Sequence, residues 1–322
     1  MRLFFLVFFI IPSMFVFAQF DTNYVHKTKN QFMVYPLLES ANTTMYYDYV
    51  NADNSETSLT YTSRDFNSLG FGVSFYRLGF SLSFELPATN IPELKNHKAF
   101  NFKGGYSYRK LYGEIKIRNY NGVEEHIVNS DSNYSSTKIR LDIKMRQYGA
   151  QVYYFFAKKY NYDANFKNYN IQKKSAVSPY LNIGTNYYYT TGDYLLTDSS
   201  ENFAFITKFQ NYSLRVMPGF SFSIVHKHLY LAAMGGIGAA LNRNTVHLAL
   251  NSVKYWSVSP IYEFNAAVGY STTSWFVTLV LSVEFDNVNY GTEHLAARNN
   301  LLSFKVGKRF NSKYLGKVGK YL

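Results

Sequence analysis

Residues 212–225 read Tyr-Ser-Leu-Arg-Val-Met-Pro-Gly-Phe-Ser-Phe-Ser-Ile-Val and alternate between large apolar side chains and small or polar ones. Because successive side chains of a β-strand point to opposite faces, the even-numbered residues from Tyr212 to Ile224 share one apolar face. The odd-numbered residues from Ser213 to Ser223 share the opposite, mostly polar face. The stretch is longer than the usual strand of about five or six residues. It therefore predicts a tilted strand that spans a membrane as part of a β-barrel.

The same alternation recurs along the chain, and the connections between alternating stretches are either very short or long and polar. Outer-membrane barrels have short periplasmic turns and long external loops. The sequence therefore predicts an all-β, antiparallel, transmembrane up-and-down barrel of about twelve strands (roughly 10–14), with both termini in the periplasm. The expected strands are 43–49, 69–76, 79–86, 100–108, 111–119, 145–156, 178–190, 212–225, 229–241, 259–271, 275–290 and 300–310.

Residues 157–177 do not fit this count. A strand at residues 162–169 would be a thirteenth, and an odd number would place a long loop on the side of the short turns. We therefore interpret residues 157–177 as a long periplasmic connection or an inward fold. The alternative is a barrel of fourteen strands, in which residues 31–38 and part of the 157–177 segment both pair.

The composition excludes several classes of protein. The 322 residues include no Cys, 19% aromatic residues and 17% charged residues, against about 25% charged residues in soluble domains. After the N-terminal apolar segment, no run reaches the roughly 18 consecutive apolar residues that a spanning helix needs. These features exclude a multi-helix membrane protein, a disordered chain, a disulfide-stapled domain and a typical cytosolic enzyme.

The formal net charge of +12 predicts anionic partners. Lys and Arg are scattered over strands and loops without a recognition motif, so nucleic acid is not an expected partner. The expected partners are the headgroups of outer-membrane lipids, including the phosphates of lipopolysaccharide. No cofactor is expected.

The N-terminus has the features of a secretory signal peptide. Arg2 precedes an apolar core, and Val16-Phe17-Ala18 resembles a cleavage site that would leave Gln19 as the mature N-terminus. Export and a barrel together predict an outer-membrane protein inserted by the barrel-assembly machinery. The expected organisation is a signal peptide (1–18), a periplasmic N-terminal segment (19–42), the β-barrel (43–310) and a basic C-terminal tail (311–322).

Charged residues at polar positions of the expected strands are candidates for the barrel lumen. They are Glu85, Lys103, Glu114, Lys116, Arg118, Arg215, Glu263, Glu284, Asp286 and Lys305, together with Arg309. One interpretation is that they form ion pairs that fill a narrow lumen, where solvation is limited. The other interpretation is a selectivity ring in a water-filled pore. The mixed signs favour mutual neutralisation over strong ion selectivity.

The histidines give little support to catalysis or metal binding. They are His26, His97, His126, His226, His228, His247 and His294, in the N-terminal segment, in long loops or beside a tight turn. An outer-membrane lipase or deacylase needs a His that activates a Ser nucleophile, and the motifs typical of such enzymes are absent. His226 and His228 share a face of an extended chain, but no carboxylate or third His lies nearby in sequence. We therefore expect neither a catalytic site nor a metal site.

Three stretches resemble the landmarks of an envelope family. They are Arg146-Gln147-Tyr148-Gly149-Ala150-Gln151-Val152-Tyr153-Tyr154-Phe155-Phe156, Tyr162-Asp163-Ala164-Asn165-Phe166 and Gln172-Lys173-Lys174-Ser175-Ala176. They are similar to the central signature of a Bacteroidetes family known as domain of unknown function four-four-two-one. The resemblance covers residues 20–310 and departs at Val177, where Gly is expected. It implies an outer-membrane-type barrel in a Gram-negative envelope, with no assigned reaction.

The family-like motif of Gln172, Lys173, Lys174, Ser175 and Ala176 has two interpretations. It is either a capped polar connection at the periplasmic rim, or an inward loop that constricts the lumen or docks a periplasmic partner. For the whole protein, we favour a non-enzymatic outer-membrane barrel, either a narrow channel or a structural or assembly component of the envelope. The alternatives are a lipid-modifying outer-membrane enzyme and a secreted β-sandwich that binds a ligand. The polar face is rich in Gly, Ser and Asn, as a narrow lumen requires, which argues against the sandwich.

Overall fold

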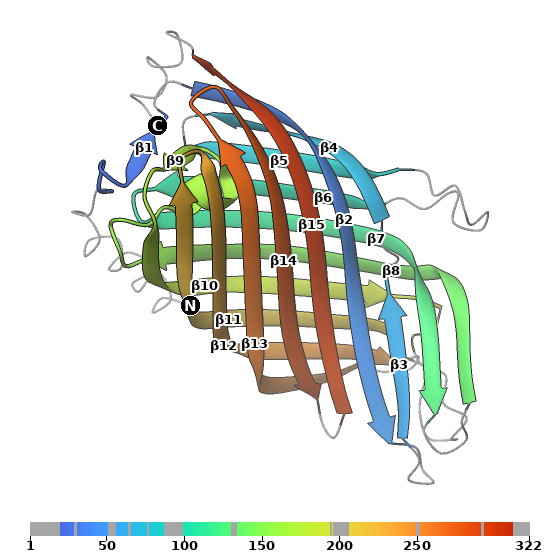
Figure 1. The fold of residues 1–322 in the computed structure, drawn as a ribbon. Coiled ribbons are helices and arrows are strands. Elements are labelled where there is room, and N and C mark those ends of the chain that lie inside the picture. The colour runs from blue at the N-terminus through green and yellow to red at the C-terminus, as the bar shows by residue number, and fades with distance from the viewer. Residues whose placement is uncertain are drawn as a thin grey trace.

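Antiparallel strands make up most of the structure, a computed structural model that describes residues 20–28, 31–50, 56–63, 66–75, 77–86, 99–129, 134–193, 195, 206–248, 252–290 and 293–311. Twelve strands form a closed ring (Figure 1). They are β2 (Gln31–Val50), β4 (Phe66–Phe75), β5 (Leu78–Glu85), β6 (Phe100–Tyr108), β7 (Leu111–Asn129), β8 (Tyr134–Phe155), β10 (Ala176–Thr191), β11 (Ile206–His226), β12 (Leu229–Leu248), β13 (Ser252–Ser271), β14 (Trp275–Tyr290) and β15 (Glu293–Asn311).

The ring closes because its first strand pairs with its last. The register of β2 and β15 runs from Asp48 opposite His294 to Gln31 opposite Asn311. Each other strand of the ring pairs with its neighbours in chain order. This closure confirms the expected antiparallel transmembrane barrel and its strand number. The β-sandwich alternative is wrong, because a sandwich has two separate sheets.

The set of strands that forms the ring differs between the two ends of the barrel. After β2 the chain returns through β3 (Glu56–Thr62), which lies between β2 and β7, and then through β4, which lies between β2 and β5. At one end of the barrel, β3 therefore fills the position that β4, β5 and β6 occupy at the other end. The sequence did not predict β3, because its inward residues Leu59 and Tyr61 alternate with polar outward residues, the reverse of a lipid-facing strand.

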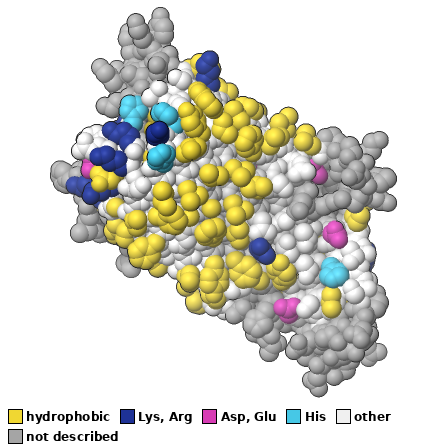
Figure 2. All heavy atoms as spheres, viewed as in Figure 1, with side chains coloured by type: hydrophobic (Ala, Val, Ile, Leu, Met, Phe, Trp, Pro, Cys, Tyr) yellow, Lys and Arg dark blue, Asp and Glu magenta, His cyan; other side chains and the backbone are white. Residues whose placement is uncertain are grey.

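The outer wall is apolar over the middle of the barrel (Figure 2). Along β11, the even-numbered residues from Tyr212 to Ile224 are exposed and the intervening residues are buried or half-buried, as predicted. Phe220 on β11 and Ile237 on β12 are 70% and 65% exposed, which is favourable in lipid but costly in water. No helix in the described part of the chain is long and apolar enough to cross a membrane.

The two ends of the barrel differ in their connections. At the turn end, strands are joined by tight turns such as residues 109–110 and 227–228, where Arg109 and Lys227 adopt a left-handed backbone with φ of 55°. At the loop end, several strands continue past their expected limits. The predicted loop at residues 120–144, for example, is mostly occupied by β7 and β8.

The barrel begins earlier than expected. Residues 31–42 belong to β2 and pair with β15 on one side and β4 on the other, so the predicted boundary at residue 43 was wrong. The alternation was hidden because both faces are apolar here. Tyr35 and Leu37 point inward and are buried, whereas Leu38 points outward. The predicted signal peptide and all but the first residue of the predicted tail lie outside the described residues.

Candidate functional site in the lumen

The connection between β8 and β10 folds into the turn end of the lumen and forms a plug, residues 157–175 (Figure 1). It contains the π-helix η2 (Asp163–Lys167) and the strand β9 (Asn170–Gln172). β9 pairs with β1 (Val25–Lys27), so the N-terminal segment lies against the plug. Residues 160–166 are all buried. The inward-fold interpretation is therefore confirmed, and the fourteen-strand alternative is wrong because the plug adds no strand to the wall.

Short polar side chains join the plug to the wall. Asp163 accepts a hydrogen bond from the hydroxyl of Ser107 on β6. Asn165 accepts a hydrogen bond of 2.7 Å from a serine on β11. Asn168 donates a hydrogen bond of 2.9 Å to the hydroxyl of Thr278 on β14. Because these partners come from three separate parts of the ring, the plug is held from several sides.

Aromatic rings fill the space between the plug and the wall. The ring centroid of Tyr162 lies 4.3 Å from that of Tyr112 on β7 and 5.6 Å from that of Tyr153 on β8. Phe166 stacks on Tyr162 at 5.0 Å. Aromatic pairs at such separations contribute about 0.5–1.5 kcal/mol each beyond the burial of their area. The turn end of the lumen is therefore packed like a protein core.

Gln172, the first residue of the family-like motif, holds the base of the plug. It is buried, and its Nε2 donates hydrogen bonds to the backbone oxygens of Lys159, at 2.7 Å, and Lys174, at 3.0 Å. Its Oε1 accepts a backbone N–H bond of 3.1 Å from within the plug. Lys173 and Ser175 are exposed at the rim. Of the two interpretations of the motif, a buried Gln172 that caps backbone oxygens and exposed residues 173–175 fit a capped polar connection at the rim, which leads from the plug into β10.

Charged side chains meet across the middle of the lumen. The Nζ of Lys116 on β7 lies 2.5 Å from the Oε2 of Glu284 on β14. These strands stand opposite one another, six positions apart in either direction around the ring. Arg118 lies 3.8 Å from the same oxygen, and all three residues are buried. The pair therefore closes the lumen at this level. Because neither charged group is solvated by water, each needs the opposite charge of the other to remain ionised.

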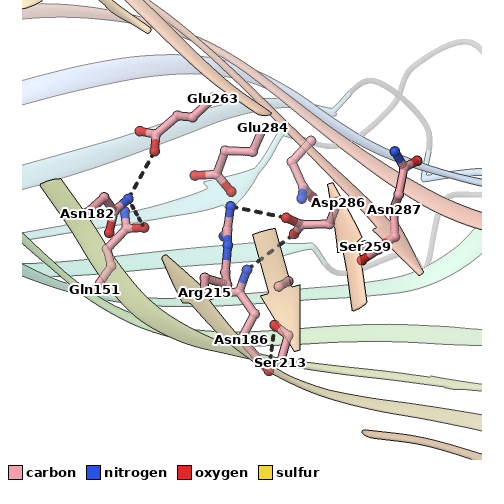
Figure 3. Close-up of polar contacts among 12 residues, drawn as sticks. Gln151, Asn182, Asn186, Ser213, Arg215, Ser259, Glu263, Glu284, Asp286 and Asn287 are labelled. Atoms are coloured by element: carbon pink, nitrogen blue, oxygen red, sulfur yellow. Dashed lines mark hydrogen bonds and ion pairs between the residues drawn. The ribbon is translucent and has the colours of Figure 1, made fainter. Parts of the chain in front are cut away.

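A second ion pair lies closer to the loop end. The Nη2 of Arg215 on β11 lies 3.1 Å from the Oδ1 of Asp286 on β14 (Figure 3). Tyr188 and Asn186 on β10 donate hydrogen bonds of 2.6 Å and 3.3 Å to the other oxygen of Asp286. Tyr188 in turn accepts a hydrogen bond of 3.0 Å from Asn299 on β15. This network ties β10, β11, β14 and β15 together across the lumen.

Glu263 on β13 is surrounded by hydrogen-bond donors. Its carboxylate accepts hydrogen bonds from Tyr153 at 2.7 Å and Asn265 at 2.6 Å. Asn182 donates a third, of 3.2 Å, and Figure 3 shows Asn182 between Glu263 and Gln151. Three donors occupy most of the accepting capacity of a carboxylate. The Glu263 carboxylate therefore uses most of its hydrogen-bonding capacity within the lumen wall, and it is poorly placed for acid–base chemistry.

A polar cavity of about 50 Å³ lies between the plug and the ion pairs. Glu39 on β2 borders it, accepts a hydrogen bond of 3.1 Å from Asn101, and lies 3.9 Å from the Nζ of Lys103. On the plug side, the Nζ of Lys167 lies 2.6 Å from the Oε2 of Glu114. A cavity of this volume holds on the order of three water molecules. It is a small polar space bounded by charged and aromatic side chains of the wall and the plug.

Apolar side chains close the loop end of the lumen. This loop-end cluster comprises Ala41, Met45, Tyr47, Leu59, Tyr61, Ala99, Tyr120, Val123, Ile143, Met145, Leu195, Ile206, Phe209, Val246 and Leu301. Tyr61 on β3 also donates a hydrogen bond to the backbone oxygen of Leu195. Over the described residues, three layers therefore fill the lumen in succession, namely the plug, the charged layer and the loop-end cluster.

The ten predicted lumen residues lie on the inner face of their strands, but they do not form one ring. Five of them make up the two ion-pair groups. Glu85 instead accepts a backbone N–H bond of 2.9 Å from the residue before β6. Lys305 lies 6.0 Å from the centroid of the Tyr35 ring. Arg309 donates a hydrogen bond of 2.7 Å to the backbone oxygen of Asn168 in the plug.

The sequence did not point to three residues of the network. Glu39 fell in the segment assigned to the periplasm, and Lys167 fell in the connection of undecided position. Tyr188 was not among the predicted lumen residues, but it has the same parity along β10 as the inward residues Asn182 and Asn186. That shared parity was the available signal for placing its hydroxyl in the lumen.

Two histidines contact polar groups at the loop end. The Nδ1 of His126 lies 2.8 Å from the hydroxyl of Thr137, and the Nε2 of His247 lies 3.0 Å from the amide oxygen of Gln210. Within the described ranges, no group of three or more His, Cys, Asp or Glu residues could hold a metal ion. His97 lies outside those ranges.

A sequence model of the family described as Domain of unknown function (DUF4421) matches residues 19–310, which include nearly the whole barrel. The chain belongs to the DUF4421 family. The predicted family resemblance is thereby confirmed. In this DUF4421 protein, the motif that begins at Gln172 lies where the plug leads into β10. No curated protein matches the sequence.

Several solved structures are similar to this DUF4421 protein. The outer membrane protease OmpT from Escherichia coli is 7% identical, with 90% of this chain and 100% of that chain covered and a TM-score of 0.45. The translocator domain of the autotransporter NalP from Neisseria meningitidis is 9% identical, with 85% and 88% covered and a TM-score of 0.42. The toluene transporter TodX from Pseudomonas putida is 6% identical, with 87% and 90% covered and a TM-score of 0.30. Similarity at these identities and scores says nothing about activity.

Proposed function

We propose that this protein is a non-enzymatic outer-membrane barrel with a sealed lumen, a structural or assembly component of the envelope. The observation that carries the proposal is the ion pair of Lys116 and Glu284, which joins opposite walls of the ring. The plug lies on one side of this pair and the loop-end cluster on the other. A channel needs a continuous hydrated path, and three filled layers oppose one.

The outer wall supports residence in the outer membrane. A closed ring satisfies its backbone hydrogen bonds internally, and its exposed apolar band needs lipid around it. The family match from residue 19 supports a signal peptide at residues 1–18, which would direct the chain out of the cytoplasm. The barrel-assembly machinery of a Gram-negative, Bacteroidetes-type envelope would then insert it. In this orientation the turn end faces the periplasm and the loop end faces the exterior.

Planar-bilayer recording tests the sealed barrel. We expect purified protein with the heat-modifiable gel mobility of a folded barrel to insert without unitary current. The double variant Lys116→Ala/Glu284→Ala should also be silent, because the plug and the loop-end cluster remain. Unitary currents of reproducible size from the unmodified protein would contradict the proposal.

A gated narrow channel is the second candidate, and the polar cavity beside the plug favours it. The plug contacts the wall through side chains, and its strand β9 pairs with β1 and not with the ring. Replacing residues 160–171 with a Gly-Ser linker distinguishes the two candidates. A sealed barrel stays silent after this replacement, because the charged layer remains, whereas a gated channel conducts.

A further inference from the structure

Five basic side chains point outward near the loop end of β8 and β11–β13. They are Lys144, Arg146, Lys208, Arg243 and Lys254, here called the basic belt. Among the described residues of β10–β13, and of β8 from Lys144 onward, they are the only charged side chains on the outer face. Asp142, two residues above Lys144, is held by Arg140 at 2.7 Å. Asp193 is exposed two residues beyond the end of β10, next to the strand position that pairs with Lys144 and Lys208. The five cations therefore outnumber the nearby carboxylates and give net positive charge at one edge of the apolar band.

Aromatic rings lie beside three of the five belt cations. Arg146 and Lys208 approach the same ring, that of Tyr189, at 6.0 Å and 5.1 Å from its centroid. Arg243 lies 6.0 Å from the exposed ring of Trp256. A cation that rests on an aromatic face keeps its full charge and its hydrogen-bond donors for an incoming anion. The belt is thus arranged to receive phosphate oxygens.

Neutral polar groups lie among the cations. Gln210 donates a hydrogen bond of 2.6 Å to the hydroxyl of Tyr187 and lies 3.0 Å from the imidazole of His247. Thr245 stands between Gln210 and Lys254 in the register. Such hydroxyl, amide and imidazole groups are suitable partners for sugar hydroxyls. The belt spans four strand spacings of about 4.8 Å, or roughly 19 Å, which is wide enough for a sugar headgroup as well as its phosphate.

A groove of about 610 Å³ lies on the outer wall on the turn-end side of the belt. Its floor is Gly235 on β12, which stands between Phe220 on β11 and Phe264 on β13 in the register. A Cβ at Gly235 would meet only ordinary contacts, at 3.6 Å and 3.8 Å. Because the flanking rings are exposed and the floor has no side chain, the wall leaves a hollow the width of an acyl chain.

The depth of the groove matches the end of a lipid tail. Ile237, at the near edge of the groove, is six residues from Arg243 along β12. Six residues rise roughly 20 Å along a strand, or about 15 Å along the membrane normal at the usual tilt. Half of a hydrocarbon core of about 30 Å is also about 15 Å. A lipid with its headgroup on the belt would therefore place the end of its tail in the groove.

We propose that β8 and β10–β13 bind one phosphorylated glycolipid of the outer leaflet, with phosphate on the basic belt and an acyl chain in the groove. The assignment rests on the proposed outer-membrane residence, because only then does the loop end meet the outer leaflet. The width of the belt and its neutral polar groups favour a phosphorylated sugar headgroup over the smaller headgroup of an anionic phospholipid.

Binding of three lipid probes to the purified barrel in detergent tests this site. The probes are phosphorylated lipid A, dephosphorylated lipid A and phosphatidylglycerol. We expect Arg243→Gln/Lys254→Gln to weaken binding of phosphorylated lipid A by about tenfold, equivalent to about 1.4 kcal/mol. The matched control is Arg298→Gln/Lys308→Gln, which removes two exposed cations from the outer face of β15 and should leave binding unchanged.

The groove has its own variant. Gly235→Leu fills the hollow and should weaken both lipid A probes to the same extent, because both carry the same acyl chains. Equal binding of phosphorylated and dephosphorylated lipid A, equal losses in the two double variants, or equally tight phosphatidylglycerol would each overturn the assignment. Each variant is first checked for heat-modifiable mobility. If the lipid-site proposal is wrong, the protein should still give no unitary current in planar bilayers. The binding experiment therefore tests the lipid site separately from the proposal that the lumen is sealed.

Discussion

At the scale of single residues, the lumen depends on charges that have no access to water. Lys116 and Glu284 are 2% and 5% exposed, and each neutralises the other across the full width of the ring. Burying two ions in this way contributes little net stability, but removing only one leaves an uncompensated charge. The pair therefore contributes more to specifying that β7 and β14 face each other than to the net stability of the barrel.

Glu284→Ala should lower the free energy of unfolding by about 3–5 kcal/mol, because it leaves the buried ammonium group of Lys116 without its carboxylate partner. Replacing both residues with apolar ones, as in Lys116→Met/Glu284→Leu, should recover only part of that loss, because Lys116 no longer needs a partner but the buried Arg118 still loses the Glu284 carboxylate. Guanidinium unfolding in detergent measures both values. The control Glu124→Gln changes an exposed carboxylate on the same strand as Lys116 and should shift the value by less than about 0.5 kcal/mol. A single variant as stable as the double variant would contradict the pairing.

Gly79 on β5 makes room for the plug. The hydroxyl of Tyr169 occupies the space that a Cβ at Gly79 would need. We expect Gly79→Ala to displace the plug while the ring still forms, and Gly79→Ala/Tyr169→Ala to restore the docked state. Trypsin cleavage at Lys167 measures displacement, because the docked plug holds this half-buried residue against Glu114. Gly113→Ala, where a Cβ meets only ordinary contacts of 3.9 Å and 4.0 Å, is the matched control and should resist cleavage like the unmodified protein.

At the scale of elements, the plug contains a group that titrates near neutral pH. Burial raises the pKa of the Asp163 carboxyl from its ordinary value of 3.8 to about 6, and the Ser107 hydrogen bond and the charge of Lys167 oppose the rise. Arg77 and Arg109 line the same space at the turn end. A raised pKa means that docking takes up a proton, so the stabilisation is complete below about pH 4 and is lost as the pH rises through 6.

The plug should therefore resist proteolysis better at pH 5 than at pH 7.5. Asp163→Asn removes the titrating group, keeps a hydrogen-bond acceptor for Ser107, and should make cleavage independent of pH over this range. Limited digestion with a protease whose activity is corrected at each pH measures the effect. Greater protection at pH 7.5 than at pH 5 in the unmodified protein would contradict the sign of the shift.

The spanning parts of the strands were predictable because lipid imposes a period of two that is visible in residues such as those of β11. The ends of the strands were not predictable, because beyond the lipid both faces of a strand meet water or polar side chains. β3 shows this loss most clearly, since its apolar residues Leu59 and Tyr61 point inward. At β2 the opposite happens, and an apolar inner face at Tyr35 hides the alternation.

At the scale of the whole molecule, the sequence could place charged residues in the lumen but could not pair them. Lys116 and Glu284 are 168 residues apart, and they meet only because β7 and β14 are opposite in a ring of twelve. A change in ring size would give both residues other neighbours. The sequence alone could not predict the basic belt for the same reason. Its residues come from four strands, and only the register of those strands brings them to one level of the outer wall.

The pairing of β2 with β15 has a further consequence for how the chain folds. Gln31 and Asn311 are partners in the finished ring, so the contact that completes it spans almost the entire sequence. Folding slows as native contacts join residues more distant in the chain. Before the C-terminal strand arrives, the growing sheet has two free edges that can recruit strands from other chains. Closure is therefore a late kinetic step, and aggregation competes with it until β15 is in place beside β2.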